Sequence, residues 1–185
     1  MRIIAGKNRG TVLADLGAGD LDAHLRPTPD RVRESLFSML EHLGVIRGAQ
    51  VLDIFAGTGA LGLEALSRGA QAVVFVENGG IAQKLVVENI RKLRVEAQAK
   101  LLRADATRLG PSLTGPADLV FLDPPYGKGM GQQALLAARA GGWLAPEATI
   151  VWEESAPMEA PEGFTRKDRR KFGSTHVTLL RFDPP

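Results

Sequence analysis

The fold of this chain is decided by one stretch, LVFLDPPY at residues 119–126. Its first four residues are apolar, which is typical of a strand buried on both faces of a parallel sheet. Two successive prolines fix two φ angles and remove two N–H donors, so the strand cannot continue past Asp123. Pro124 also favours an extended conformation at Asp123. We therefore expect a rigid corner at the carboxyl end of a central strand, where open α/β sheets bind their ligands.

The chemistry of this corner suits a planar ligand that carries an NH2 group. Asp123 accepts hydrogen bonds, the carbonyl of Pro124 has no ladder partner, and Tyr126 offers a flat ring. A nucleobase with an exocyclic amine has this shape. A simpler interpretation also fits, in which a Pro-Pro turn is capped by a tyrosine that packs on the core. The motif alone does not decide between the two.

Apolar runs and amphipathic segments alternate on both sides of this stretch. We expect buried strands at residues 51–55, 72–76, 99–103, 119–122 and 148–152, and helices ending near Arg68, Leu93 and Ala140. An antiparallel hairpin is expected from residues 164–169 and 175–182. This pattern predicts an α/β fold with a doubly wound, mostly parallel sheet. No linker is apparent, so we expect one domain over residues 26–185 and a small N-terminal extension.

The N-terminal extension, residues 1–25, is expected to hold a basic-tipped β-hairpin formed by residues 1–6 and 11–13, followed by a loop. The next segment predicts a helix with Thr28 at the N-cap and Pro29 at the first helical position. Its inward face is expected to consist of Val32, Leu36, Phe37, Leu40 and Leu43, and Gly44 is the stop signal.

The composition is that of an ordinary globular protein, with 44% hydrophobic and 24% charged residues among 185. No apolar run approaches a membrane span, and the start lacks a signal-peptide core. The chain has no cysteine, which excludes disulfides, thiolate metal sites and the cysteine nucleophile that pyrimidine C5 methylation generally needs. The cytoplasm is the default location, and a monomer is the default state.

The net charge is only +2, but its distribution is uneven, since residues 166–171 hold five cations in six positions. If the two ends of the chain meet in space, their cations form one surface that faces phosphates. Otherwise they are separate solvated faces, which is the safer interpretation for Arg31 and Arg33 individually. The candidate RNA contacts are Arg2, Lys7, Arg9, Arg26, Arg31, Arg33, Arg169, Arg170 and Lys171.

A nucleoside-binding pattern precedes the decisive stretch. Residues 57–62, GTGALG, match G-x-G-x-x-G between a strand and a helix, and Glu77 ends the next strand. This suits NAD or S-adenosylmethionine, because both contain a ribose. Asp53 favours S-adenosylmethionine, since a carboxylate suits a sulfonium and an ammonium, and Asp105 is placed to accept from the adenine amine. The candidate cofactor residues are Asp53, Phe55, Gly57, Thr58, Gly59, Glu77, Asn78, Asp105, Ala106 and Asp123.

Any one of these acids could instead cap the helix that follows its strand. Four acids at successive strand ends favour a nucleoside cofactor, and the DPPY motif favours S-adenosylmethionine over NAD. A dehydrogenase also lacks a hydride-transfer partner, because His24, His42 and His176 have no recognisable catalytic context.

Four segments resemble the RsmD family: residues 1–6 (MRIIAG), 26–34 (RPTPDRVRE), 53–62 (DIFAGTGALG) and 123–126 (DPPY). The likeness covers nearly the whole chain in the same order, and the first two segments are the specific ones. It implies a class I, Rossmann-like methyltransferase that uses S-adenosylmethionine. It also implies that the acceptor is the N2 amine of a guanine in small-subunit (16S) ribosomal RNA. We expect that RNA to be bound within a small-subunit ribonucleoprotein, although the sequence does not distinguish this from naked RNA.

The predicted catalytic residues are Asp123, Pro124 and Tyr126. Asp123 and the Pro124 carbonyl would accept from the two amine N–H groups and turn the nitrogen lone pair towards the methyl group. Tyr126 would stack on an extruded base. This direct displacement needs no metal and no covalent intermediate. The motif fits adenine N6 or a side-chain amide equally, so another RNA, DNA or a protein glutamine remains an alternative acceptor, and a non-catalytic RNA-binding factor is an alternative of another class.

Overall fold

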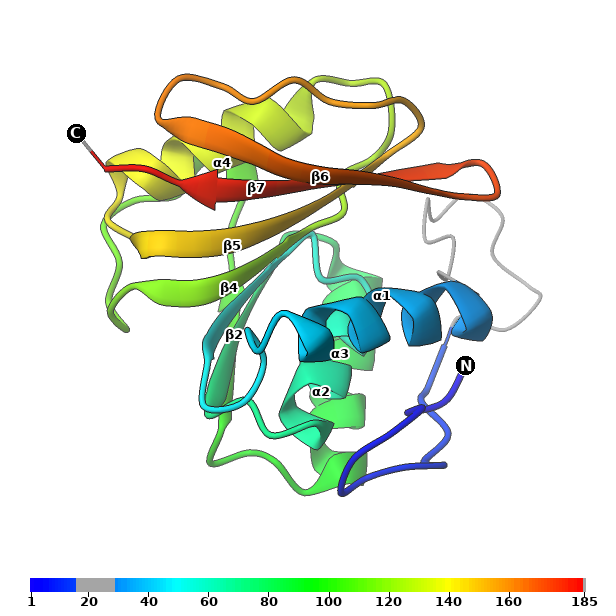
Figure 1. Cartoon of the computed structure of the whole chain (residues 1–185). Coiled ribbons are helices and arrows are strands. Elements are labelled where there is room, and N and C mark those ends of the chain that lie inside the picture. The colour runs from blue at the N-terminus through cyan, green and yellow to red at the C-terminus, as the bar shows by residue number, and fades with distance from the viewer. Residues whose placement is uncertain (16–28, 185) are drawn as a thin grey trace.

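The computed structural model describes residues 1–15 and 29–184, which form an α/β fold with helices on both faces of one sheet (Figure 1). The strands are β1 (Gln50–Ile54), β2 (Ala72–Glu77), β3 (Ala99–Arg103), β4 (Ala117–Leu122), β5 (Leu144–Glu154), β6 (Phe164–Phe172) and β7 (Thr175–Phe182). The helices are α1 (Asp30–His42), α2 (Ala60–Ser67), α3 (Gly80–Leu93) and α4 (Met130–Ala140), with a short 3-10 turn η2 (Ala106–Arg108).

The strand order is β3-β2-β1-β4-β5-β7-β6. The first five strands are parallel, while β7 runs antiparallel to both β5 and β6. The predicted doubly wound, mostly parallel sheet with an antiparallel C-terminal hairpin is therefore confirmed. Because the chain winds outward from β1 in one direction and from β4 in the other, the carboxyl ends of these two strands form the switch point where such sheets bind ligands.

The helix α1 differs from its prediction at both ends. It begins at Asp30, with Pro29 at the N-cap, while Thr28 lies outside the described residues. Leu43 was expected to face inward but is exposed, because it follows the last helical residue. Arg33 was expected on an outer face, yet its exposed fraction is 0%. The helical period explains this, since position 33 precedes the inward-facing Leu36 and Phe37 by three and four residues.

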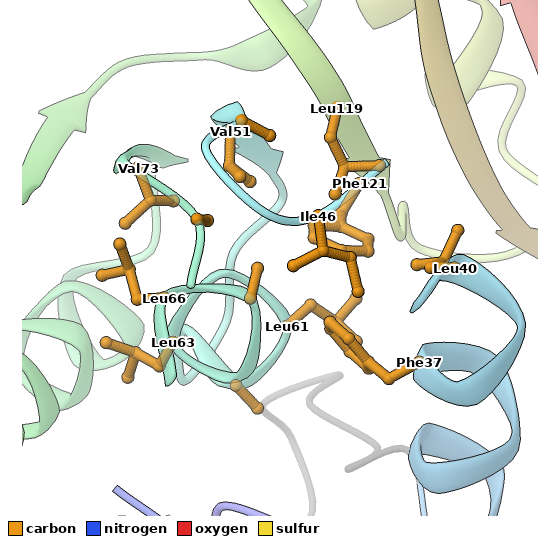
Figure 2. Close-up of a cluster of buried hydrophobic side chains, with 14 of the residues drawn as sticks. Phe37, Leu40, Ile46, Val51, Leu61, Leu63, Leu66, Val73, Leu119 and Phe121 are labelled. Atoms are coloured by element: carbon orange, nitrogen blue, oxygen red, sulfur yellow. The ribbon is translucent and has the colours of Figure 1, made fainter. Parts of the chain in front are cut away.

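The larger core cluster lies between the sheet and the helices α1 and α2 (Figure 2). Phe37 from α1 packs against Phe121 of β4, with ring centroids 5.5 Å apart. All eight residues of α2 are buried, so this helix is enclosed on every side. The close approach of α2 to the sheet depends on Gly62, where a Cβ would lie 2.6 Å from Phe75 Cε1 and 2.7 Å from Val73 Cγ2.

The N-terminal segment, residues 1–15, packs against the helices α2 and α3 (Figure 1). The predicted hairpin is present as a short antiparallel pairing, in which Arg2 lies opposite Val12 and the Ile3 N–H donates to Thr11 O at 2.9 Å. Ile3 and Leu13 are buried in the same core cluster as α2. The expected loop lies largely outside the described residues, so a boundary near residue 25 stays a prediction. None of the helices within residues 1–15 and 29–184 is long and apolar enough to cross a membrane.

Candidate active site

The DPPY corner lies at the carboxyl end of β4, as the prolines predict. The strand ends at Leu122, and the Asp123 N–H donates to Ile54 O of β1 at 3.4 Å. Leu122 pairs with Trp152 of β5, so the next residue of each strand places Asp123 beside Glu153. Side chains alternate along a strand, and Phe121 faces the α1–α2 side. Asp123 therefore lies on that side of the sheet.

Three carboxyl groups share this face at the switch point, because Asp53 and Glu153 follow the inward-facing Val51 and Val151 by two residues. Burial raises the pKa of Asp123 well above its usual range, and the charges of Glu153, Asp53 and Glu154 raise it further. Burial likewise raises the pKa of Asp53 to about 8, partly offset by a hydrogen bond from the Gly62 N–H at 2.9 Å. The site therefore holds several carboxyl groups whose ionised forms are disfavoured. A cation bound beside them would stabilise those ionised forms.

The glycine-rich loop follows β1 and is held in place by Glu77. One carboxylate oxygen of Glu77 accepts from the Gly57 N–H at 2.9 Å, and the other accepts from the Gly79 N–H at 2.7 Å. Gly57 and Gly59 have φ values of 58° and 77°, a region that glycine adopts without cost. Phe55 adopts a φ of 62° without being glycine, and such backbone strain clusters at ligand sites.

Asp105 caps the turn η2, since its Oδ1 accepts from the Thr107 N–H at 2.9 Å and from Thr107 Oγ1 at 2.7 Å. These bonds hold the pKa of Asp105 below its usual range. The capping alternative considered for the strand-terminal acids therefore describes Asp105, which leaves its second oxygen for other contacts. Ala106, the next candidate, is buried in the core.

Tyr126 is partly exposed beside the start of β7, where its hydroxyl lies 3.4 Å from Thr175 Oγ1. Burial of the phenol raises the pKa of Tyr126 to about 12. The next residue, Gly127, donates its N–H to the carboxylate of Glu154 at 3.1 Å. Glu154 thereby ties the DPPY corner to the end of β5. The ring of Tyr126 is not buried in the core, contrary to the simpler interpretation of the motif.

The comparisons with known proteins agree with this geometry. A family model described as Conserved hypothetical protein 95 matches residues 1–181. Ribosomal RNA small subunit methyltransferase D of Escherichia coli K12 is 37% identical over 161 residues, which cover 87% of this chain and 78% of the relative. The protein of the same name from Haemophilus influenzae is 36% identical over 186 residues, covering 98% and 93%. The chain belongs to the RsmD family.

A solved structure described as a putative methyltransferase, yhhF from Escherichia coli, is 34% identical to this RsmD-family chain. The two superpose with a TM-score of 0.85, and the match covers 100% of this chain and 99% of the other. The fold is therefore that of the Rossmann-like methyltransferases, as the sequence predicts.

The candidate RNA contacts of this RsmD-family member fall into separate places. Lys7 lies at the amino-terminal edge of the sheet, where its N–H donates to Ser67 O and its Nζ to Gln98 Oε1, and Arg9 belongs to the same turn. Residues 170 and 171 end β6, which is parallel to β5, and so they lie at the opposite edge with Asp123. Lys7 and Arg9 therefore do not share one surface with the cations at the end of β6, which agrees with the alternative of separate faces, and their own contact with RNA stays a prediction.

Three further arginines are already engaged, since Arg170 Nε donates to Asp168 Oδ2 at 2.7 Å in addition to the contacts of Arg33 and Arg169, and one candidate is not described. The buried Arg33 donates from Nη2 to Arg2 O at 2.6 Å and to Asp30 Oδ1 at 2.7 Å, so its predicted exposure to phosphates is wrong. Arg169 donates to Met158 O at 2.7 Å and to Glu159 Oε1 at 2.6 Å. Arg26 lies outside the described residues. Arg2 and Arg31 remain exposed near the start of α1.

Sequence reasoning missed the two acids that end β5. Glu153 and Glu154 follow an apolar strand in the same way as Asp123 follows β4, so the signal was present. It also missed the buried Asn89 of α3, which contacts the glycine-rich loop. A single asparagine within a helix gives no sequence signal of that kind.

Proposed function

We propose that this protein transfers a methyl group from S-adenosylmethionine to the N2 amine of a guanine in small-subunit (16S) ribosomal RNA. The observation that carries the proposal is the DPPY corner at the carboxyl end of β4, beside the buried Asp53 and the glycine-rich loop of β1. The family membership supports the reaction class, and the names of the two relatives, both ribosomal RNA small subunit methyltransferase D, support ribosomal RNA as the substrate.

The residues present suit this cofactor. Burial opposes the ionisation of Asp53, and a neighbouring sulfonium or ammonium would offset the cost of its negative charge. The glycine-rich loop lets a ligand approach the backbone, and Glu77 stands at the strand end where an acid can hold ribose hydroxyls. We assign the cofactor to Asp53, Phe55, Gly57, Thr58, Gly59, Glu77, Asn78, Asp105, Ala106 and Asp123. Bound S-adenosylmethionine would supply the methyl group as an electrophile.

The protein's own part in the reaction is to orient the acceptor amine. The lone pair of an exocyclic amine is delocalised into its ring, which makes the nitrogen a weak nucleophile. Hydrogen bonds to the Asp123 carboxylate and the Pro124 carbonyl would fix both N–H groups and direct the lone pair at the methyl carbon. Tyr126, held beside Thr175, would stack on the extruded base. The methylated amine would then release its surplus proton to water.

We propose that the RNA backbone lies along the edge of the sheet that contains Asp123. Among the candidate RNA contacts, the exposed cations near this edge are Arg170, which also pairs with Asp168, Lys171 at the end of β6, and Arg2 and Arg31 near the start of α1. A ribosomal RNA substrate would place the protein in the cytoplasm, and we propose that it acts as a monomer on a small-subunit ribonucleoprotein.

The proposal is tested with labelled S-adenosylmethionine and small ribosomal subunits that lack modification. After incubation, the RNA is digested and the labelled nucleoside is identified. We expect N2-methylguanosine at a single site, and loss of the label with Asp123→Ala while RNA binding is retained. Label on adenosine or on protein would overturn the acceptor, and binding of NAD in place of S-adenosylmethionine would overturn the cofactor. RNA binding by the wild type without any label would indicate a non-catalytic binding factor.

A further inference from the structure

Asn89 lies in the middle of a connection between the N-terminal segment and the glycine-rich loop. The residue belongs to α3, and its exposed fraction is 0%. Its Oδ1 accepts from the Ala14 N–H at 2.6 Å, and its Nδ2 donates to Ala14 O at 3.1 Å and to Thr58 O at 2.9 Å. Both amide N–H groups are thus used, and the reversed amide would place oxygen against two carbonyls.

The Thr58 carbonyl is the point at which this connection meets the loop. It lies between Gly57 and Gly59, and glycines give a loop extra backbone freedom. A loop that is ordered only when its ligand binds loses this conformational entropy on binding. Glu77 holds one side of the loop through the Gly57 N–H. Asn89 holds the other side through Thr58 O. A loop fixed at both points is pre-organised for its ligand.

The same N-terminal segment is fixed elsewhere by contacts that do not touch the loop. The carboxylate of Glu64 accepts from the Ile4 and Ala5 N–H groups at 2.8 and 3.1 Å. Asn8 donates from Nδ2 to Leu93 O, at the end of α3 far from the glycine-rich loop. The segment is therefore docked on the helices through several bonds, and within residues 1–15 only the bonds at Ala14 lead through a side chain, that of Asn89, to the loop.

We propose that Asn89 is a positioning residue for the cofactor loop, and that it makes docking of the N-terminal segment at Ala14 and binding of the cofactor mutually favourable. This inference rests on the proposed function, because it takes residues 57–59 to contact S-adenosylmethionine. The coupling is reciprocal by thermodynamic necessity: a ligand that orders the Thr58 carbonyl also favours the bonds between Asn89 and Ala14.

The test compares Asn89→Ala with the matched variant Asn8→Ala in the full chain. Each change removes an asparagine that joins the N-terminal segment to α3, but only Asn89 reaches the loop. Binding of S-adenosylhomocysteine is measured by calorimetry, and the melting temperature is measured in parallel. We expect the Kd to rise about tenfold or more for Asn89→Ala and to stay within about twofold for Asn8→Ala, although both variants lose stability.

An unchanged Kd for Asn89→Ala, or an equal rise for Asn8→Ala, would overturn the proposal. Failure of the wild type to bind S-adenosylhomocysteine would instead contradict the proposed function. A second measurement uses the wild type alone, in case Asn89→Ala does not fold. Added S-adenosylhomocysteine should slow amide hydrogen exchange of residues 10–15, and exchange that is unaffected by the ligand would refute the coupling.

Discussion

Asp123 and Glu153 stand side by side at the carboxyl ends of two neighbouring parallel strands, on the same face of the sheet. After burial, the charge of Glu153 is the largest cause of the raised pKa of Asp123, ahead of Asp53 and Glu154. The carboxyl group that we propose to accept hydrogen bonds from the substrate amine thus lies where its ionised form is disfavoured.

The first prediction concerns the pH dependence of methyl transfer. Asp123 is expected to act when ionised, so its raised pKa limits the rate on the acid side. Glu153→Gln removes one negative charge beside Asp123 and so lowers the pKa of Asp123. The acid limb of the pH–rate profile, where the rate falls as Asp123 is protonated, should therefore move to lower pH. The measurement is the single-turnover rate on RNA as a function of pH. Glu159→Gln, an equal charge change at an exposed position, is the control and should leave the limb in place. An acid limb that is the same in Glu153→Gln and wild type would contradict the prediction.

The second prediction concerns stability without ligand. Because the pKa of Asp53 is about 8 in the folded protein against an ordinary 3.8, the folded state retains a proton that the unfolded state loses. The stabilisation of the folded state by this retained proton is fully present below about pH 4, and it is lost as the pH rises towards 8. Asp53→Asn cannot ionise, so its melting temperature should exceed that of the wild type by a margin that grows from pH 5 to pH 8. The growth should be about 3–5 °C per pH unit. A constant margin would show that Asp53 does not titrate in this window.

The third prediction compares two glycines, Gly62 within α2 and Gly80 at the start of α3. Gly62→Ala places a Cβ against Phe75, Val73 and Asp53 Oδ2, all within 3.0 Å, in a rigid part of the core. We expect a loss of about 1–3 kcal/mol in the free energy of unfolding, measured in urea. Gly80→Ala is the control, because nothing lies within 4 Å of its added Cβ. It should be neutral or gain up to about 1 kcal/mol. Equal losses for the two variants would contradict the packing argument.

The fourth prediction concerns the RNA surface. Arg170→Glu with Lys171→Glu should weaken RNA binding and reduce the slope of log K against log salt by about 1–2, while cofactor affinity stays unchanged. Arg47→Glu with Lys100→Glu is the matched control, since it makes the same charge change at the amino-terminal edge of the sheet. RNA affinities that fall equally in both double variants would indicate a general effect of net charge and not a surface beside Asp123.

Strand positions could be predicted because each buried strand is a short apolar run with a sharp end. The two prolines after Asp123 cannot donate backbone hydrogen bonds, so β4 ends just before them. The bounds of α4 and β7 agree with their predictions. Strand β5 was predicted too short, because its flanks carry a proline and three glutamates, which are residue types common in loops. Its true end matters, since it supplies Glu153 and Glu154 to the site.

Sequence alone could not distinguish a charged residue on the surface from one that is buried. Arg33 lies on the apolar face of α1, where its guanidinium donates hydrogen bonds to Arg2 O and to Asp30. A pattern of residue types does not reveal such partners. Distances between chain ends were equally inaccessible. Lys7 and Lys171 are both basic turn or strand-end residues, and only the topology places them at opposite edges of the sheet.

The docking of residues 1–15 has a consequence for the order of folding. The bond from the Ile4 N–H to Glu64 spans 60 residues, and that from Asn8 to Leu93 spans 85. During synthesis this segment is made well before its partners, so it must wait until α2 and α3 have formed on the sheet. Contacts of such long range close late, because the chain must first lose the entropy of the intervening loop. The Asn89 connection at Ala14 spans 75 residues, so the glycine-rich loop gains its second support only near the end of folding.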